Sequence, residues 1–230
     1  MSLFGKAVVA IWNDITAKGR ANFIEWHNRE HIPERVAIPG FHRGRRYLAE
    51  AGAPEYFTLY EAHDTGVLVG APYLERLNNP TAWTKESTAH FRNTLRGVCS
   101  TIYSKGTGEG VFMLTLRFDA DPARAQALRA FLLDQALPTL NDLTGICGVH
   151  LCIADQAASG LETAERKGRS VGVPNWIVMI EGSWREQVEQ AADRLLTSDL
   201  ASRGTLGQPV RGLYRLEFSR IDPAPFTRDA

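Results

Sequence analysis

The length, composition and charge of the chain exclude several classes of function. It has 230 residues, 44% of them hydrophobic, which is enough to bury a core in one large domain or two small ones. Lys plus Arg and Asp plus Glu both number 26, so the formal net charge is zero. Such a chain has no net field that attracts nucleic acid or an anionic membrane. We therefore expect neither as a partner and expect a small-molecule ligand.

The N-terminus and the cysteines together predict a cytoplasmic protein. The apolar run within residues 1–15 is too short to span a bilayer and lacks the order of regions that a signal peptide has. The three cysteines are odd in number and form no C-x-x-C pair, so we expect reduced thiols in the core: Cys99, Cys147 and Cys152.

The first half of the chain predicts the order βαββαβ. Short apolar or alternating runs predict strands at 6–12, 41–49, 56–62 and 97–103. Thr16 can cap a helix that we expect to end near His31, because Pro33 disfavours continuation. A second helix is expected around 71–77.

The plan restarts after a glycine-rich hinge at 105–110. Strands are expected at 111–118, 149–154, 176–181 and 213–219, with helices at 122–140 and 185–196. Most polar side chains of residues 23–48 have apolar or small counterparts in this second copy. We therefore divide the chain into a site-bearing repeat at 1–105 and a scaffold repeat at 106–230.

A βαββαβ unit is a ferredoxin-like arrangement, with an antiparallel four-stranded sheet and both helices on one face. Both faces of the strand at 6–12 are apolar, so the open face of the sheet needs cover as well. The predicted fold class is α+β: two tandem ferredoxin-like units whose sheets pack face to face within one chain, with the helices outside and a central cavity.

Residues 27–31, His-Asn-Arg-Glu-His, match the H-x-x-E-H pattern of one class of zinc peptidases. That chemistry needs a third ligand from a later helix. The helix here is expected to stop before Pro33, and no downstream acidic helix offers an obvious ligand. We therefore expect no metal.

The string from Trp26 to Pro33, the strand entry Ile38-Pro39-Gly40-Phe41 and the repeat plan resemble the dimeric α+β barrel superfamily, especially its EthD-like branch. Most relatives build the barrel from two chains, and this chain resembles a tandem version. The resemblance implies a family that includes isomerases, cofactor-independent monooxygenases, polyketide cyclases, haem enzymes and proteins without an established reaction. The fold alone therefore does not fix the function.

The candidate site lies where the first helix meets the strands at 41–49 and 56–62. Histidine and tyrosine in an apolar cavity can polarise a carbonyl and move a proton. Alternation along the strands leaves open whether His42 and Arg46, or Arg43, Arg45 and Tyr47, face the barrel interior. The proton-transfer candidates are His27, His31, His42 and Tyr60, and the ligand-binding candidates are Trp26, Arg46, Tyr47, Trp83 and His90.

Two functions remain open at this point. The first is an enzyme without an organic cofactor that isomerises, cyclises or oxygenates a small apolar carbonyl or phenolic compound. The second is a non-catalytic binding or stress-related protein that uses the same cavity. A haem role would need an axial histidine, and nothing near His90 or His150 singles one out.

Three structural alternatives also stay open. His27 and His31 could simply cap the helix or pair near its C-terminus, where the helix dipole favours histidine. The nearby arginines, including Arg43 and Arg45, could be solvated or paired with Glu25, Glu30 and Glu34. The polar segment at 155–174 is a predicted loop and a candidate lid. A homodimer is possible, although an intrachain barrel already covers the surface that pairs in single-copy relatives.

Overall fold

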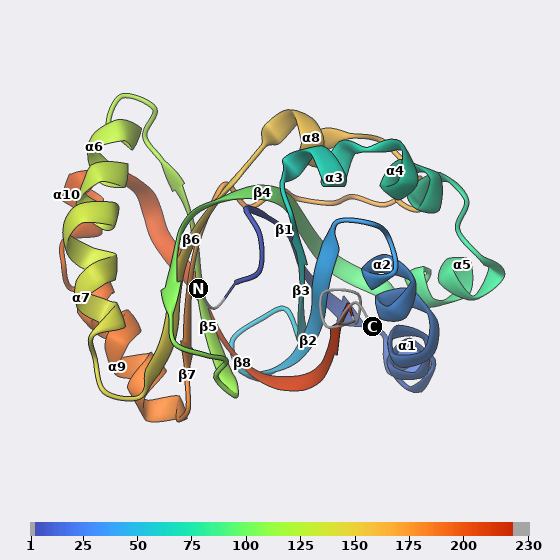
Figure 1. Ribbon diagram of the computed structural model, residues 1–230, viewed down its shortest axis with the longest axis horizontal. Coiled ribbons are helices and arrows are strands. Elements are labelled where there is room, and N and C mark those ends of the chain that lie inside the picture. Colours follow the sequence, from blue (N-terminus) through green and yellow to red (C-terminus); the bar gives the residue numbers. More distant parts are fainter. Residues whose placement is uncertain (1–2, 223–230) are drawn as a thin grey trace, which may run out of the picture.

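The computed structural model describes residues 3–222, in which eight strands form one closed antiparallel barrel (Figure 1). Its order is β1-β3-β2-β8-β5-β7-β6-β4. The strands are β1 (Ala7–Ile15), β2 (Phe41–Ala51), β3 (Tyr56–Ala62), β4 (Phe91–Gly106), β5 (Phe112–Ala120), β6 (Ile146–Ala154), β7 (Trp176–Gly182) and β8 (Thr205–Ile221). All eight predicted strands are confirmed, and several extend beyond their predicted ends.

Two long strands join the halves. β4, with 16 residues, pairs with β1 of its own half and with β6 of the other, and β8, with 17 residues, pairs with β5 and with β2. The two four-stranded sheets therefore face each other across the interior and continue into one another at both edges. The predicted α+β barrel of two ferredoxin-like units within one chain is confirmed.

The helices lie outside the barrel (Figure 1). Those of the first half are η1 (Ala17–Gly19), α1 (Arg20–Trp26), η2 (His27–His31), α2 (Ile32–Val36), α3 (Thr65–Val69), α4 (Ala71–Asn78) and α5 (Ala82–Thr88). Those of the second half are α6 (Ala125–Phe131), η3 (Leu132–Ala136), α7 (Leu137–Asn141), α8 (Gln156–Gly160), α9 (Arg185–Leu196) and α10 (Leu200–Arg203). Within residues 3–222, none of these is long and apolar enough to cross a membrane.

The first long helix continues past Pro33, so the predicted end near His31 is wrong. Residues His27–His31 form a π turn, in which the Ile32 N–H donates to the carbonyl oxygen of His27. Pro33 then lies in the first turn of α2, where a missing N–H costs little. The second half repeats this arrangement, because the π turn Leu132–Ala136 precedes Pro138.

Among residues 3–222, buried side chains pack in the interior of the barrel, where the sequence predicted a central cavity. Apolar residues such as Trp12, Phe57 and Met179 form one packed cluster in the interior. Beside them lies a buried charge network, which we define as Arg43, Arg45, Glu61, Glu181 and His150, each with 0% of its side chain exposed.

The buried charge network links the two halves across the interior. Arg43 Nε donates to Glu61 Oε1 at 2.7 Å, and Arg45 Nη2 lies 3.0 Å from the same oxygen. Arg45 also reaches both carboxylate oxygens of Glu181 on β7, at 3.1 and 3.2 Å. The alternative that Arg43 and Arg45 are solvated or paired with helix glutamates is therefore wrong, because alternation along β2 turns both inward.

We expect Glu181→Gln to lower the free energy of unfolding by about 3–5 kcal/mol, because it leaves the buried Arg45 with too little counter-charge. Denaturant unfolding measures this loss. The matched control is Glu50→Gln, which removes the partner of Arg215 in a pair whose side chains are 31% and 46% exposed. That exposed pair should be worth less than about 1 kcal/mol. Equal losses in the two variants would show that the buried pair has no special weight.

Candidate functional site

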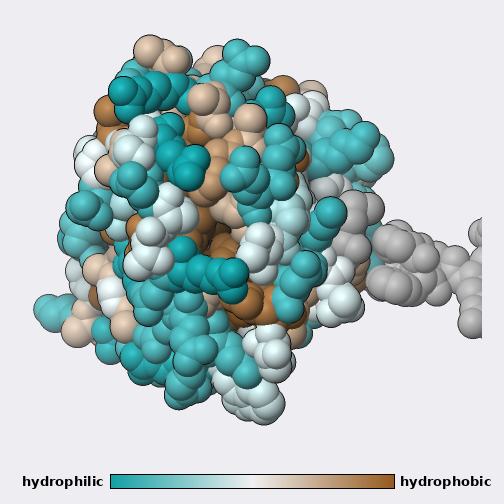
Figure 2. Space-filling view, turned by 90° about the vertical axis from the view of Figure 1, so that its left-hand side faces the viewer, coloured by the Kyte–Doolittle hydropathy of each residue, from teal (hydrophilic) through white to brown (hydrophobic). Residues whose placement is uncertain are grey.

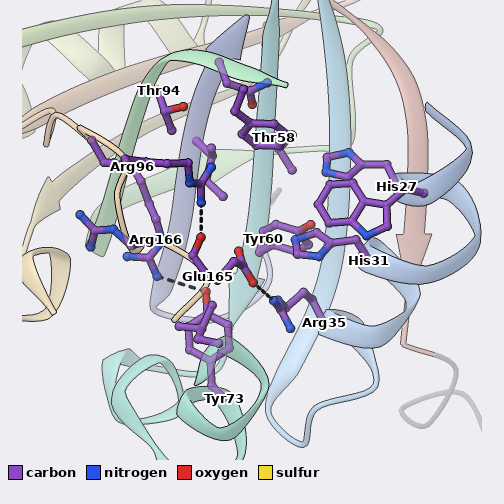
Figure 3. Close-up of a pocket in the computed structure, with 17 residues that line it drawn as sticks. His27, His31, Arg35, Thr58, Tyr60, Tyr73, Thr94, Arg96, Glu165 and Arg166 are labelled. Atoms are coloured by element: carbon purple, nitrogen blue, oxygen red, sulfur yellow. Dashed lines mark hydrogen bonds and ion pairs between the residues drawn. The ribbon is translucent and has the colours of Figure 1, made fainter. Parts of the chain in front are cut away.

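A cavity lies between the outer face of the first-half sheet and the helices that pack on it. Its volume is about 40 Å³, room for a few water molecules. Strands β1, β3 and β4 form one wall and the helices from α1 to α4 form another. Residues 165–171, from the connection between β6 and β7, close it. The lining residues are Ile11, Asn13, Trp26, His27, His31, Arg35, Thr58, Tyr60, Tyr73, Leu77, Phe91, Thr94, Arg96, Glu165, Arg166, Arg169 and Val171 (Figure 3).

The π turn holds the two histidines of the helix wall. The rings of His27 and His31 are parallel, with an interplanar angle of 2° and centroids 5.4 Å apart. The Trp26 ring packs 4.1 Å from that of His31, and its Nε1–H donates to Thr84 Oγ1 at 3.2 Å. Trp26 thus ties the histidines to α5.

The glutamate of the H-x-x-E-H pattern does not line the cavity. Glu30 Oε1 accepts a hydrogen bond of 2.6 Å from Thr81, the residue that caps α5. Within residues 3–222, no group of three or more histidine, cysteine or acidic side chains is arranged to hold a metal ion. The pattern here belongs to a helix–helix contact.

Strand alternation supplies the opposite wall. Thr58 and Tyr60 of β3 face the helices, whereas Phe57 and Glu61 face the barrel interior. The edge of the Tyr60 ring approaches His31, with centroids 6.2 Å apart. Figure 3 shows His27 and His31 projecting from the helix toward this strand.

Burial sets the protonation states of these groups. It lowers the pKa of His27 well below the ordinary value of 6.5, and the nearby charge of Arg46 adds to the effect. Burial, followed by the charge of Arg35, lowers the pKa of His31 in the same way. Burial also raises the pKa of Tyr60. At neutral pH the cavity therefore presents two neutral imidazoles and a protonated phenol.

Several buried polar atoms in the cavity have no hydrogen-bond partner among the described residues. They are His27 Nδ1, His31 Nδ1, Thr58 Oγ1 and the Tyr60 hydroxyl. An unsatisfied buried polar group costs about 1–3 kcal/mol. Atoms of this kind, gathered around one cavity, favour a ligand with polar atoms of its own.

The closing segment belongs to the second half of the sequence but packs on the first. α8 lies above α3 and α4 (Figure 1), and Ala158 packs into the core of the first half. Further along, the N–H of Glu165 donates to the Leu77 carbonyl at 3.0 Å, and its carboxylate lies 2.5 Å from Arg35 Nη2. The loop predicted at 155–174 thus contains one short helix and covers the cavity.

Four of the predicted site residues line this cavity together: Trp26, His27, His31 and Tyr60. Arg46 lies behind them, bonded to Asn28 Oδ1 at 2.9 Å and to Glu217 at 3.1 Å. Its charge still acts on His27.

The other predicted site residues lie elsewhere. A β-bulge between Phe41 and Arg43 takes His42 out of regular alternation, and its ring lies 6.1 Å from that of His63. Tyr47 is inside the barrel, next to Phe57.

Trp83 and His90 make structural contacts at the edge of α5. Trp83 Nε1–H donates to Asn22 Oδ1 at 2.6 Å, and His90 Nδ1 lies 2.7 Å from Thr16 Oγ1. Neither lines the cavity, so the structure does not bring these two ligand-binding candidates to the site.

Sequence reasoning missed the cationic rim of the cavity. The missed lining residues are Arg35, Thr58, Tyr73, Arg96, Glu165, Arg166 and Arg169. The run Glu-Arg-Lys-Gly-Arg at 165–169 is a dense group of charges inside the candidate lid, and it was the available signal. Its spatial partner, Arg35, lies 130 residues away in sequence.

The matching place in the second half lacks this chemistry. The π turns align His27 with Leu132 and His31 with Ala136, and the matching strands β3 and β7 align Tyr60 with Ile180. A hollow between α6, α7 and α9 has a mixed lining without histidine or tyrosine: Phe131, Gln135, Ala136, Thr139, Leu140, Arg194, Leu195 and Ser198. Figure 2 shows this helical face, with hydrophobic residues at the bottom of a hollow.

Comparisons with known proteins establish the fold. No protein-family profile matches the sequence, and no curated protein matches it. Similar solved structures include an anthrone oxidase-like protein (13% identity, TM-score 0.67, covering 94% of this chain and 92% of that one). A protein assigned as a monooxygenase from Fusobacterium nucleatum is 8% identical, with a TM-score of 0.61 and coverage of 95% and 96%. A chlorite dismutase-like protein is 10% identical, with a TM-score of 0.58 and coverage of 98% and 100%.

Another similar structure is described as a haem-binding protein from Thermus thermophilus (10% identity, TM-score 0.53, covering 95% of this chain and 93% of that one). The residues here do not fit a haem group. His27 and His31 face a cavity of about 40 Å³, far too small for a porphyrin. His150, the histidine of the second half, is enclosed in the barrel between Glu181 and Ser104.

The lowered pKa values predict acid sensitivity. Below pH 6.5 the unfolded histidines take up protons that buried His27 and His31 do not, so stability should fall as the pH drops through that value. The slope should reach about 1.4 kcal/mol per pH unit for each histidine. Denaturant unfolding between pH 7.5 and 5 measures it.

The double variant His27→Gln/His31→Gln should flatten this slope. Exposed His63 provides the control, since His63→Gln should leave the slope unchanged. An unchanged slope in the double variant would mean that other groups cause the acid sensitivity.

Proposed function

We propose that the cavity removes a proton from a small, largely apolar compound that carries a carbonyl or phenolic group. The observation that carries this proposal is the pair of neutral imidazoles, each with a buried Nδ1 that has no partner among the described residues, across the cavity from the protonated hydroxyl of Tyr60. A base and an acid that differ in pKa, placed around one enclosed space, are the components of general acid–base catalysis.

In this proposal His31 is the base. Its neutral ring accepts the proton from the carbon next to the carbonyl, or from the phenol oxygen, while the Tyr60 O–H donates a hydrogen bond to the substrate oxygen. His27, parallel to His31, is the second proton-transfer group. Trp26 and Phe91 supply an apolar wall, and the arginines of the rim stabilise the anion that forms.

Isomerisation, cyclisation and oxygenation of such compounds can all begin with this step. The anion returns a proton at another position, attacks a second carbonyl, or reacts with O₂ supplied from solution. None of these first steps needs an organic cofactor. The fold similarity to proteins named as an anthrone oxidase-like protein and a monooxygenase supports the oxygenation branch and suggests anthrone, an enolisable aromatic ketone, as a probe.

The same proposal includes the finer family placement, a tandem chain similar to the EthD-like branch. Residues 1–105 carry the proton-transfer groups, and residues 106–230 provide the scaffold and the closing segment. We propose a cytoplasmic protein that acts as one chain or as a homodimer of such chains.

A non-catalytic binding protein is the second candidate. The volume of the closed cavity, about 40 Å³, favours it, because an organic ligand needs the closing segment to move and could then be held without reaction. The two candidates differ in whether a bound compound exchanges protons with the protein.

We expect the wild-type protein to accelerate deuterium exchange at the acidic CH₂ group of anthrone under anaerobic conditions, as followed by NMR. His31→Gln and Tyr60→Phe should each lower the rate by about 10²-fold, the lower end of what a general acid or base supplies. The matched control, His63→Gln, should keep the wild-type rate. Oxygen uptake in air then shows whether oxygenation follows.

Binding of anthrone without acceleration of exchange in the wild type would favour the non-catalytic candidate. Acceleration that survives in both His31→Gln and Tyr60→Phe would contradict the assigned roles.

A further inference from the structure

The cavity has more positive than negative groups. Among the described residues that line it, four are arginines and one is a carboxylate: Arg35, Arg96, Arg166, Arg169 and Glu165. Glu165 lies between Arg35 on one side and Arg96 and Arg166 on the other (Figure 3). Buried charges of one sign are costly unless an opposite charge accompanies them.

The single lining carboxylate is already used by Arg35. Glu165 Oε2 lies 2.5 Å from Arg35 Nη2, and the Arg35 side chain is 3% exposed. The other carboxylate near Arg35 is Glu34, at 3.5 Å, and Arg76 shares it at 3.3 Å. Arg35 therefore depends mainly on a residue of the closing segment.

The other arginines contact neutral oxygens and, for Arg169, the ring of Phe91, whose centroid lies 5.4 Å from its Cζ. Arg96 Nη2 donates to the Tyr73 hydroxyl at 3.1 Å, and Arg166 Nη1 donates to the Ser159 carbonyl at 2.6 Å. Arg169 Nη2 donates to the Glu165 carbonyl at 2.7 Å, while its buried Nε and Nη1 have no partner among the described residues. Burial lowers the pKa of both Arg166 and Arg169, and the charges of Glu162 near Arg166 and of Glu165 near Arg169 offset this only in part.

A carboxylate is the chemical group that this arrangement lacks. Guanidinium groups bind carboxylates through paired N–H donors, with bonds stronger than those to neutral oxygens. The free Nε and Nη1 of Arg169 and the Nη2 that Glu165 occupies on Arg35 belong to the same cavity. Glu165 thus resembles an internal substitute for an acidic ligand.

We propose that the compound bound in this cavity carries a carboxylate, which replaces Glu165 on Arg35 and pairs with the free donors of Arg169. This inference rests on the proposed function and narrows its substrate class to acidic phenols or acidic carbonyl compounds. The exchange removes only the side-chain contact between Glu165 and α2. The backbone hydrogen bond from Glu165 to the Leu77 carbonyl remains, and it keeps Arg169, four residues further along the same segment, beside the cavity.

The test compares two probes of the same shape. Calorimetry measures the binding of 3-hydroxy-2-naphthoate, which has a phenol and a carboxylate, and of 3-hydroxy-2-naphthamide, which lacks the charge. We expect the wild type to bind the carboxylate about tenfold more tightly, as when charged hydrogen bonds replace neutral ones. Equal binding of the two probes, or binding of neither, would overturn the inference.

Two variants with opposite expected effects exclude a general structural disturbance. Glu165→Gln removes the internal competitor and should tighten carboxylate binding about tenfold, whereas Arg169→Gln should weaken it by a similar factor and abolish the preference over the amide. Arg211→Gln, at a distant surface pair with Asp193, is the control and should change nothing. Weaker carboxylate binding in Glu165→Gln would contradict the inference, and this result does not depend on whether Arg169→Gln folds.

Failure of this inference can be told apart from failure of the proposed function. If the amide binds as well as the carboxylate and His31→Gln weakens both, the carboxylate inference fails while the proton-transfer site stands. If neither probe binds and anthrone exchange is not accelerated, both fail.

Discussion

The structure depends on the charge network inside the barrel. Arg43, Arg45, Glu61 and Glu181 are stable there only because each cation meets a carboxylate of a neighbouring or opposite strand. A shift of β3 by one residue would bring Glu61 to the helix face and turn Tyr60 into the barrel. The register that pairs the charges inside is therefore also the register that places the phenol of Tyr60 opposite His31 outside. The charge pairs inside the barrel therefore determine how the cavity outside it is arranged, although none of these charged side chains lines that cavity.

The two halves share a backbone conformation and differ in the side chains at matching positions. Each has a π turn before a proline, and each enters its next strand through a glycine with a left-handed backbone, Gly40 at a φ of 93° and Gly145 at 78°. The positions of His27, His31 and Tyr60 in the first half are taken by Leu132, Ala136 and Ile180 in the second. The second half packs its helices onto its sheet through one large apolar core. In the first half, buried polar atoms without a partner among the described residues lie between the helices and the sheet, and the proposed function gives them a ligand to bind.

Much of this was predictable from the sequence, for definite reasons. Apolar runs and alternation predicted the strands, and the concentration of His27, His31 and Tyr60 in the first half pointed to a helix and a strand that line one cavity. Alternation alone could not decide whether Arg46 or the pair Arg43 and Arg45 faces the barrel, because the carboxylates that make an inward arginine stable come from other strands. Pro33 was interpreted as a helix end because a sequence does not reveal a π turn. The contact between Arg35 and Glu165 joins segments without a shared periodicity, and only the folded barrel brings them together.

The place of the closing segment in the chain affects how the sequence of such a protein can evolve. The segment connects β6 to β7, and the pairing of these two strands in the barrel fixes the positions of its two ends. Connections of this kind tolerate changes in length and sequence at a small entropic cost. The proton-transfer groups, in contrast, sit on a helix and a strand that cannot vary freely. If the proposed function holds, ligand preference and chemistry are encoded largely in separate stretches of the gene, and exchange of the segment alone would change the ligand while the reaction stays the same.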